Sequence, residues 1–238
     1  MSRIILVRHG QASFLEQNYD RLCATGEEQA RRLGEFWARR GVVFHRAWTG
    51  PRQRQIETGR IVAEAYRRAG REFSELEIMS EFDEYCGEAV LKVGVPELSE
   101  KCERIRCLQQ EFADAEEPAV RRHRFQKLFE TVISKWVAGE LNISDIESWP
   151  NFCARVNDGL AKAVNGGTRG GTHVIFTSGG PIGVAMQRAL HLSHADTLQL
   201  TWMSRNTSFS EFLGSGERFT VSCFNSHPHL DDDSLLYR

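Results

Sequence analysis

An Arg-His-Gly triplet at positions 8–10 holds the residue types best suited to chemistry on an anion. It directly follows the run 4–7, whose β-branched and aliphatic side chains predict a buried strand. The carboxyl ends of strands in open α/β sheets are where ligands bind. His9 at such an end is therefore a candidate nucleophile, and Arg8 beside it a candidate anion-binding residue.

Two further polar segments follow predicted strands. Arg54 lies in the segment 49–54, after a predicted strand at 44–49. Ser178, Gly179 and Gly180 follow the buried run 174–176 and open a predicted helix. If the strands are parallel, all three segments meet at one edge of the sheet. Arginine guanidinium groups and the unbonded backbone amides of a helix N-terminus both donate hydrogen bonds to phosphate oxygens. We therefore predict a phosphate site at this edge.

Strands and helices alternate in the first and last parts of the chain, which predicts an α/β fold. We expect three layers: a mostly parallel sheet of about six strands, with helices on both faces. Thr25 and Glu28 have the spacing of a capping box at the start of the first helix. The expected helices are 25–40, about 51–70, 152–164 and about 179–190, and the expected strands are 4–7, 44–49, 76–79, 174–176, 197–202, 207–213 and 219–224.

Between about residues 96 and 149 the alternation gives way to a charge-rich helical pattern, broken at Pro118 and Gly139. We interpret this stretch as a lid-like helical insertion in a single domain that spans residues 1–238. Its basic cluster at 121–127 either guides a phosphorylated ligand or is simply a solvated helix face.

Composition narrows the classes of function. The 238 residues carry a formal net charge of −2, which offers no general attraction for nucleic acid or an anionic membrane, so we expect neither partner. No apolar run is long enough to span a membrane, and because the first predicted strand begins almost at Met1 we expect no signal peptide. Six scattered cysteines without a Cys-x-x-Cys pair favour reduced thiols, and hence a cytoplasmic protein.

In their order along the chain, these motifs resemble the histidine phosphatase superfamily, the phosphoglycerate mutase-like family. The resemblance covers residues 4–93 and 152–230. The strongest match is the run 6–13, LVRHGQAS, and the segments 18–22 (NYDRL), 25–30 (TGEEQA), 51–58 (PRQRQIET) and 79–84 (MSEFDE) continue it.

The resemblance implies a mechanism through a phosphohistidine. His9 would be the nucleophile, while Arg8 and Arg54 hold the phosphoryl oxygens. Glu81 would be the acid that protonates the leaving oxygen, with Asp83 and Glu84 as competitors for that role. Phosphate binding is also expected from Gln11, Ser178, Gly179 and Gly180.

One position departs from the family pattern. Ser178 stands where the family carries its second histidine; His173 lies at the other end of the predicted strand, and His191 and His194 lie beyond the next helix. A serine hydroxyl donates a hydrogen bond but brings no positive charge. Loss of a good transition-state donor typically lowers the rate on the order of a hundredfold, so we expect a slower or more selective enzyme.

We therefore predict metal-independent hydrolysis of a small phosphorylated substrate, a phosphomonoester, with no cofactor. The main alternative is a non-catalytic protein that binds a phospho-ligand. A mutase is less favoured, because the family's mutases carry a Trp-Asn pair where this chain has residues 14–16, FLE. A third alternative is a metal-dependent hydrolase built on His227, His229 and the aspartates at 231–233.

Overall fold

The computed structural model describes residues 1–12, 20–142, 145–166, 168 and 170–230. Its contacts divide the chain into two compact units. The first unit comprises Met1–Glu84 and Ala154–Arg238, and the second comprises Tyr85–Cys153. Among the described residues, no helix combines the length and the apolar character that crossing a membrane requires.

The described helices and strands largely follow the expected order. The strands are β1 (Ser2–Arg8), β2 (Arg46–Thr49), β3 (Leu76–Ile78), β4 (Thr172–Thr177), β5 (Phe209–Ser215) and β6 (Arg218–Ser226). The helices are α1 (Ala24–Arg39), α2 (Gln53–Arg68), the 3-10 turn η1 (Ser80–Phe82), α3 (Gly87–Lys101), α4 (Glu103–Ala113), α5 (Pro118–Val137), α6 (Trp149–Gly166), α7 (Gly179–Leu190) and α8 (His194–Met203).

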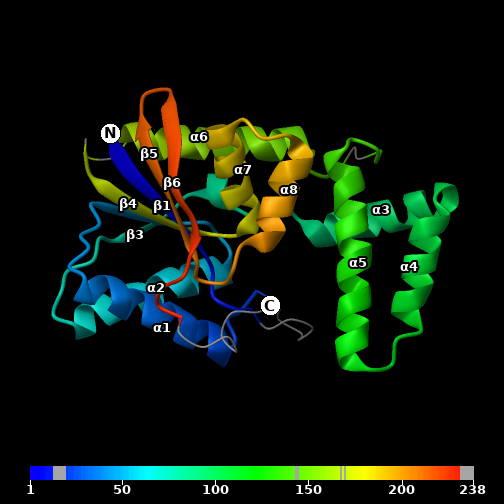
Figure 1. Ribbon diagram of the computed structural model, residues 1–238, viewed down its shortest axis with the longest axis horizontal. Coiled ribbons are helices and arrows are strands. Elements are labelled where there is room, and N and C mark those ends of the chain that lie inside the picture. Colours follow the sequence, from blue (N-terminus) through cyan, green and yellow to red (C-terminus); the bar gives the residue numbers. More distant parts are fainter. Residues whose placement is uncertain (13–19, 143–144, 167, 169, 231–238) are drawn as a thin grey trace. The chain divides into compact units, whose positions relative to one another are not determined.

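The six strands form one sheet in the order β3-β2-β4-β1-β5-β6. Pairing is parallel from β3 through β1 and antiparallel at β5 and β6. Residues 4–7 of β1 are fully buried, as their apolar character predicted. In the register, Arg8 pairs with Thr177 and Thr49 pairs with Phe176, so the three polar segments do emerge at one edge. The predicted α/β fold with a mostly parallel sheet is confirmed (Figure 1).

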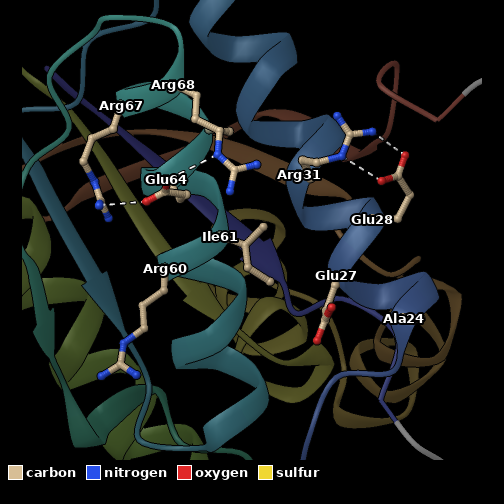
Figure 2. A pocket seen from close by; sticks show the side chains of 10 residues that line it. Ala24, Glu27, Glu28, Arg31, Arg60, Ile61, Glu64, Arg67 and Arg68 are labelled. Atoms are coloured by element: carbon tan, nitrogen blue, oxygen red, sulfur yellow. Dashed lines mark hydrogen bonds and ion pairs between the residues drawn. The ribbon is translucent and has the colours of Figure 1, made fainter.

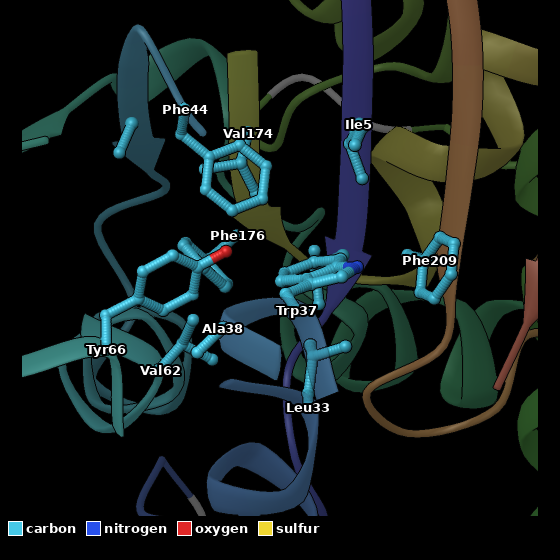
Figure 3. Packing of buried hydrophobic residues seen from close by; sticks show 12 residues of the cluster. Ile5, Leu33, Trp37, Ala38, Phe44, Val62, Tyr66, Val174, Phe176 and Phe209 are labelled. Carbon is cyan, nitrogen blue, oxygen red and sulfur yellow. The ribbon is translucent and has the colours of Figure 1, made fainter. Parts of the chain in front are cut away.

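Helices cover both faces of this sheet: α1 and α2 lie on one side, α6 and α7 on the other (Figure 1). The side of α1 and α2 holds an aromatic-rich core, in which Trp37 packs edge-on against Phe44 with ring centroids 5.1 Å apart (Figure 3). Burying each such large side chain stabilises the fold by about 1.5–3 kcal/mol. The core includes side chains of the central strands β1 and β4, so it holds these strands in place against α1 and α2.

The expected strand at 197–202 is wrong, because these residues belong to α8. Ser193 caps this helix by accepting a hydrogen bond from the Asp196 amide at 3.1 Å. The buried positions Thr197, Leu198 and Thr201 have helical spacing, and α8 packs against α7. The buried side chains therefore follow the helical period and not the two-residue period of a strand.

The expected capping box of α1 is also wrong. The helix begins at Ala24, and its N-cap is Cys23, which makes no side-chain capping bond. The carboxylate of Glu28 instead bonds to the guanidinium groups of Arg31 and Arg32 one turn further along. Those two hydrogen bonds lower the pKa of Glu28 to about 2. Glu28 therefore bonds to side chains on the surface of α1, and not to the backbone amide of the N-cap residue as a capping box requires.

The second unit is helical, as predicted for the stretch 96–149, but its first helix, α3, already begins at Gly87 and contains Pro96. Pro118 is the first residue of α5, where a proline loses no helical hydrogen bond, and the Glu117 side chain caps the amides of Ala119 and Val120. Gly139 follows α5 with a φ of +74°, a conformation that favours glycine. Whether this unit acts as a lid stays a prediction.

Candidate active site

His9 begins the loop after β1 and is nearly buried, with 6% of its surface exposed. Its backbone amide donates to the carbonyl of Thr177 on β4 at 2.8 Å, which extends the strand pairing by one residue. Its ring Nδ1 lies 2.7 Å from the carbonyl oxygen of Gly10, which can only accept, so Nδ1 carries the proton. The Nε2 atom accepts from Arg54 Nε at 3.1 Å and therefore holds a lone pair. This is the tautomer that a nucleophilic histidine requires.

Arg54 lies in the first turn of α2 and is also almost buried. Besides its bond to His9, its Nη1 donates to the Asp20 carboxylate at 2.7 Å. The other Asp20 oxygen accepts from the amide of Gln53 at 3.0 Å, at the N-terminus of the same helix. Asp20 thus fixes the direction of the guanidinium group. The sequence motif 18–22 contained this aspartate, but no role was assigned to it.

The loop that carries His9 packs against the start of α1 without room for side chains. A Cβ added to Gly10 would lie 2.4 Å from the carbonyl oxygen of Gly26, a contact between two backbones. The Gly10 amide donates to Thr58 Oγ1 at 3.0 Å, and that hydroxyl donates to the Arg54 carbonyl at 2.7 Å. These contacts explain why the two glycines and the threonine of the motif are needed to hold His9 against Arg54.

Gln11 is engaged through its backbone: its amide donates to Gln29 Oε1, and its carbonyl accepts from Cys23, both at 3.0 Å. Its expected contact with phosphate stays a prediction. Arg8, at the end of β1, donates through Nη1 to the carbonyl of Ser204, just after α8. Both residues lie at the sheet edge that carries His9.

Ser178 directly follows β4 and is the N-cap of α7, with only 1% of its surface exposed. Its Oγ accepts a hydrogen bond from Gln55 Nε2 at 2.8 Å. The amide of Gly180, in the first turn of α7, donates to Glu84 Oε2 at 3.0 Å. Ser178, Gly179 and Gly180 therefore do begin a helix, as predicted, and the strand before it pairs with the strand that leads to His9. The N-terminus of this helix also contacts an acidic residue, Glu84, from another segment of the chain.

The three candidate acids have different surroundings. The Glu81 carboxylate forms an ion pair with Lys162 of α6, and that hydrogen bond is the main reason its pKa lies below the usual value. Asp83 pairs with Arg52 at 2.6 Å. Glu84 is the acid that reaches the N-terminus of α7. An acid that must hold a proton is poorly served by a lysine partner, so this geometry favours Glu84 over Glu81.

Two residues to which the sequence assigned no definite role, Thr207 and Asn206, bond to the backbone at His9. The amide of Thr207 donates to the carbonyls of Arg8 and His9 at 3.0 and 3.3 Å. Thr207 has a φ of +54°, which is uncommon for a β-branched residue and indicates a conformation imposed by its neighbours. Asn206 donates from Nδ2 to the His9 carbonyl at 3.1 Å.

The histidines proposed for a metal bond elsewhere. His227 lies 2.8 Å through Nδ1 from the Asn225 carbonyl and 3.0 Å through Nε2 from Arg205, and His229 Nε2 lies 2.9 Å from Thr207 Oγ1. The aspartates at 231–233 lie outside the described residues. Among the residues that are described, no group of three or more His, Cys, Asp or Glu side chains is arranged to hold a metal ion.

A separate surface groove runs between α1 and α2, with a cavity volume of about 650 Å³ (Figure 2). Its lining includes ion pairs within each helix, such as Arg31 with Glu28 and Arg67 with Glu64. None of the candidate catalytic residues lines it. The groove therefore adds nothing to the chemistry at the sheet edge.

The chain is similar in fold to several solved proteins at low sequence identity. Phosphoglycerate mutase from Bacillus anthracis str. Sterne aligns with a TM-score of 0.62 at 16% identity, covering 96% of this chain and 94% of the mutase. Alpha-ribazole phosphatase from Shigella flexneri aligns with a TM-score of 0.58 at 19% identity, covering 94% and 96%. Phosphoserine phosphatase from Entamoeba histolytica aligns with a TM-score of 0.60 at 15% identity, covering 96% and 99%.

Sequence similarity points in the same direction. A 2,3-bisphosphoglycerate-dependent phosphoglycerate mutase of Parvibaculum lavamentivorans is 35% identical over 86 residues, which cover 34% of this chain and 41% of the mutase. The match thus spans less than half of that relative. The sequence model of the Histidine phosphatase superfamily (branch 1) matches residues 4–135 and 120–227. The chain belongs to the histidine phosphatase superfamily.

Proposed function

We propose that this protein hydrolyses a phosphomonoester through a phosphohistidine formed on His9, without a metal. The observation that carries the proposal is the hydrogen-bonded order Gly10 carbonyl, His9 ring, Arg54 guanidinium, which puts the ring proton on Nδ1 and the lone pair on Nε2, bonded to a cationic group that can exchange this bond for one to phosphate. The named phosphatases among the structural neighbours support phosphatase-type activity. The substrate would be a small phosphorylated molecule.

The reaction would proceed in two steps. Arg54 Nε first moves its hydrogen bond from His9 Nε2 to a phosphoryl oxygen, which frees the Nε2 lone pair. That lone pair attacks phosphorus, the P–O ester bond breaks, and the leaving oxygen takes a proton from the carboxyl group of Glu84. Water then attacks the phosphohistidine and gives its proton to Glu84, the P–N bond breaks, and its electron pair returns to Nε2. Arg8 and Arg54 offset the charge that develops on the phosphoryl oxygens.

Glu84 takes the role of acid in this proposal because its carboxylate reaches Gly180 at the N-terminus of α7. Glu81, the acid first expected from the sequence, is paired with Lys162 and would have to give up that partner before accepting a proton. Glu81 remains the alternative acid. The amides of Gly179 and Gly180 and the hydroxyl of Ser178 would bind phosphoryl oxygens.

The test measures phosphate release from an aryl phosphate in the presence of a chelator, comparing the parent chain with His9→Ala. Loss of turnover in the variant is expected, because no other group supplies the nucleophile. His123→Ala, on an exposed position of α5, is the matched control and should keep parental activity. A second variant, His9→Asn, keeps a polar side chain in case the alanine variant does not fold, as judged by circular dichroism.

Each remaining outcome identifies a different function. Turnover that survives in both His9 variants would exclude the phosphohistidine route, and turnover lost on chelation would favour a metal enzyme. Binding of inorganic phosphate without turnover of any tested ester would favour the non-catalytic binding protein. A labelled phosphoenzyme that is stable in alkali and labile in acid is expected if His9 is phosphorylated.

A further inference from the structure

Gln55 is the central residue of a buried polar network that the sequence motifs did not single out. It lies in the first turn of α2, and none of its surface is exposed. Its Oε1 accepts from the backbone amide of Arg52 at 3.1 Å. Its Nε2 donates to Ser178 Oγ at 2.8 Å and lies 3.3 Å from the Phe82 carbonyl.

These partners determine which end of the Gln55 amide faces Ser178. An N–H group needs an acceptor, so Oε1 must face Arg52, and a carbonyl needs a donor, so Nε2 must face Phe82. The amide also packs closely against Gly50, where an added Cβ would lie 2.2 Å from Gln55 Oε1. Gln55 therefore presents N–H, and not an oxygen, to the serine.

This orientation decides what the Ser178 hydroxyl can do. Because Oγ already accepts from Gln55, its own proton must be donated to some other group. With 1% of its surface exposed, the serine has almost no access to bulk water. Within the described part of the chain, Ser178 Oγ donates no hydrogen bond to another protein group. A buried donor of this kind is normally satisfied, so a ligand is the natural acceptor.

The position of Ser178 indicates which ligand atom that is. It caps α7, and the preceding residue, Thr177, pairs with Arg8 in the sheet and accepts from the His9 amide. The Ser178 hydroxyl and the first amides of α7 therefore lie at the end of β4, and β4 is paired with the strand that leads to His9.

We propose that Gln55 is a positioning residue that fixes the Ser178 hydroxyl as a hydrogen-bond donor to a phosphoryl oxygen. The proposal rests on the phosphatase function proposed above and explains how serine works where the family carries a histidine. A hydroxyl rotates freely unless something holds it, and a donor that is already oriented stabilises developing charge without reorganisation. Gln55, held by two backbone groups, supplies that orientation.

The decisive experiment is a double-mutant cycle on inorganic phosphate binding, measured by titration calorimetry on the full chain. Ser178→Ala and Gln55→Met should each weaken phosphate binding about tenfold or more, as expected when a hydrogen bond to a charged group is lost. In the Ser178→Ala background, Gln55→Met should have little further effect, because its action passes through the serine. Two independent losses that multiply would mean that Gln55 is merely structural, and would overturn the proposal.

A second variant covers the case in which Gln55→Met does not fold. In Gln55→Glu, the carboxylate would accept the Ser178 proton and turn the donor away from phosphate. Protonating that glutamate restores an O–H donor toward Oγ. Phosphate affinity relative to the parent should therefore recover as the pH falls, and should not recover in the Ser178→Ala/Gln55→Glu double variant. An affinity ratio that is constant with pH would overturn the role of Gln55.

The same measurements separate this inference from the proposed function. If the parent binds phosphate and turns over while Ser178→Ala does both equally well, the hydrolase proposal stands and the Ser178 donor is refuted. If the parent neither binds inorganic phosphate nor shows His9-dependent turnover, both proposals fail together.

Discussion

Replacing Glu84 by glutamine tests which carboxyl group supplies the proton to the leaving oxygen. The substitution keeps the size of the side chain and an oxygen that can still accept from the Gly180 amide at 3.0 Å, but removes the transferable proton. General acid–base catalysis contributes about 10²–10⁴-fold to a rate. We therefore expect kcat for an alkyl phosphate, whose leaving oxygen needs a proton, to fall by about that factor.

Glu81→Gln is the matched control, three residues earlier in the same segment. It breaks the ion pair with Lys162, whose side chain is 64% exposed. Such a partly solvated pair contributes about 0–1 kcal/mol to the free energy of unfolding. Because Lys162 also holds the Glu81 pKa below its usual value, this carboxylate is poorly prepared to carry a proton. We expect activity to stay within about threefold of the parent, since removing this carboxylate removes no proton donor from the site.

The assay follows phosphate release from two esters of different leaving ability, a nitrophenyl phosphate and an alkyl phosphate. A nitrophenolate leaves without protonation, so loss of the acid should slow the alkyl ester far more than the aryl ester. This difference distinguishes a lost proton donor from a distorted site, which would slow both esters alike. If Glu81→Gln produces the ester-dependent loss and Glu84→Gln does not, our assignment of the acid is refuted.

Two further predictions concern stability, each measured by urea unfolding. Gly10→Ala should lower the free energy of unfolding by about 1–3 kcal/mol or more, because its Cβ would lie 2.4 Å from a backbone oxygen. Gly166→Ala is the control and should be nearly neutral, because a Cβ there would meet nothing within 4 Å. Equal losses in the two variants would contradict the packing argument. Burial, with smaller contributions from the neighbouring charges of His227 and Arg32, lowers the pKa of His229 to about 3. Its neutral form therefore stabilises the fold above pH ~6.5, and this contribution falls by about 1.4 kcal/mol per pH unit as the pH drops from there toward 3. The pH slope of His229→Asn should be shallower by that amount between pH 6 and 5, and identical slopes would refute this reasoning.

The parts of the fold and site that the sequence predicted share a physical cause. Residues 4–7 are apolar without interruption because helices cover both faces of the sheet at β1, and such a strand is recognisable by composition alone (Figure 1). Once β1, β2 and β4 are parallel, the segments carrying His9, Arg54 and Ser178 must emerge together. The convergence of these segments therefore required only the order of strands and helices.

What the sequence could not predict depends on contacts between segments far apart in the chain. Choosing among Glu81, Asp83 and Glu84 needed the partners of each carboxylate, which come from α6, from Arg52 before α2 and from α7. Whether residues 197–202 form a strand or a helix depended on a cap at Ser193 and on packing against α7, both of which outweigh local propensity.

The pairing of Gln55 with Ser178 changes how this site can handle charge. A histidine at position 178 could contribute a positive charge and could also lose it near neutral pH. An amide and a hydroxyl have no charge to gain or lose across that range, so the cationic contribution falls to Arg8 and Arg54. The Asp20 carboxylate holds Arg54 in place at 2.7 Å, and the dipole of α7 adds its partial positive charge. Replacing the histidine by a serine held by Gln55 therefore removes a charge that depends on pH from the donors around the phosphoryl group.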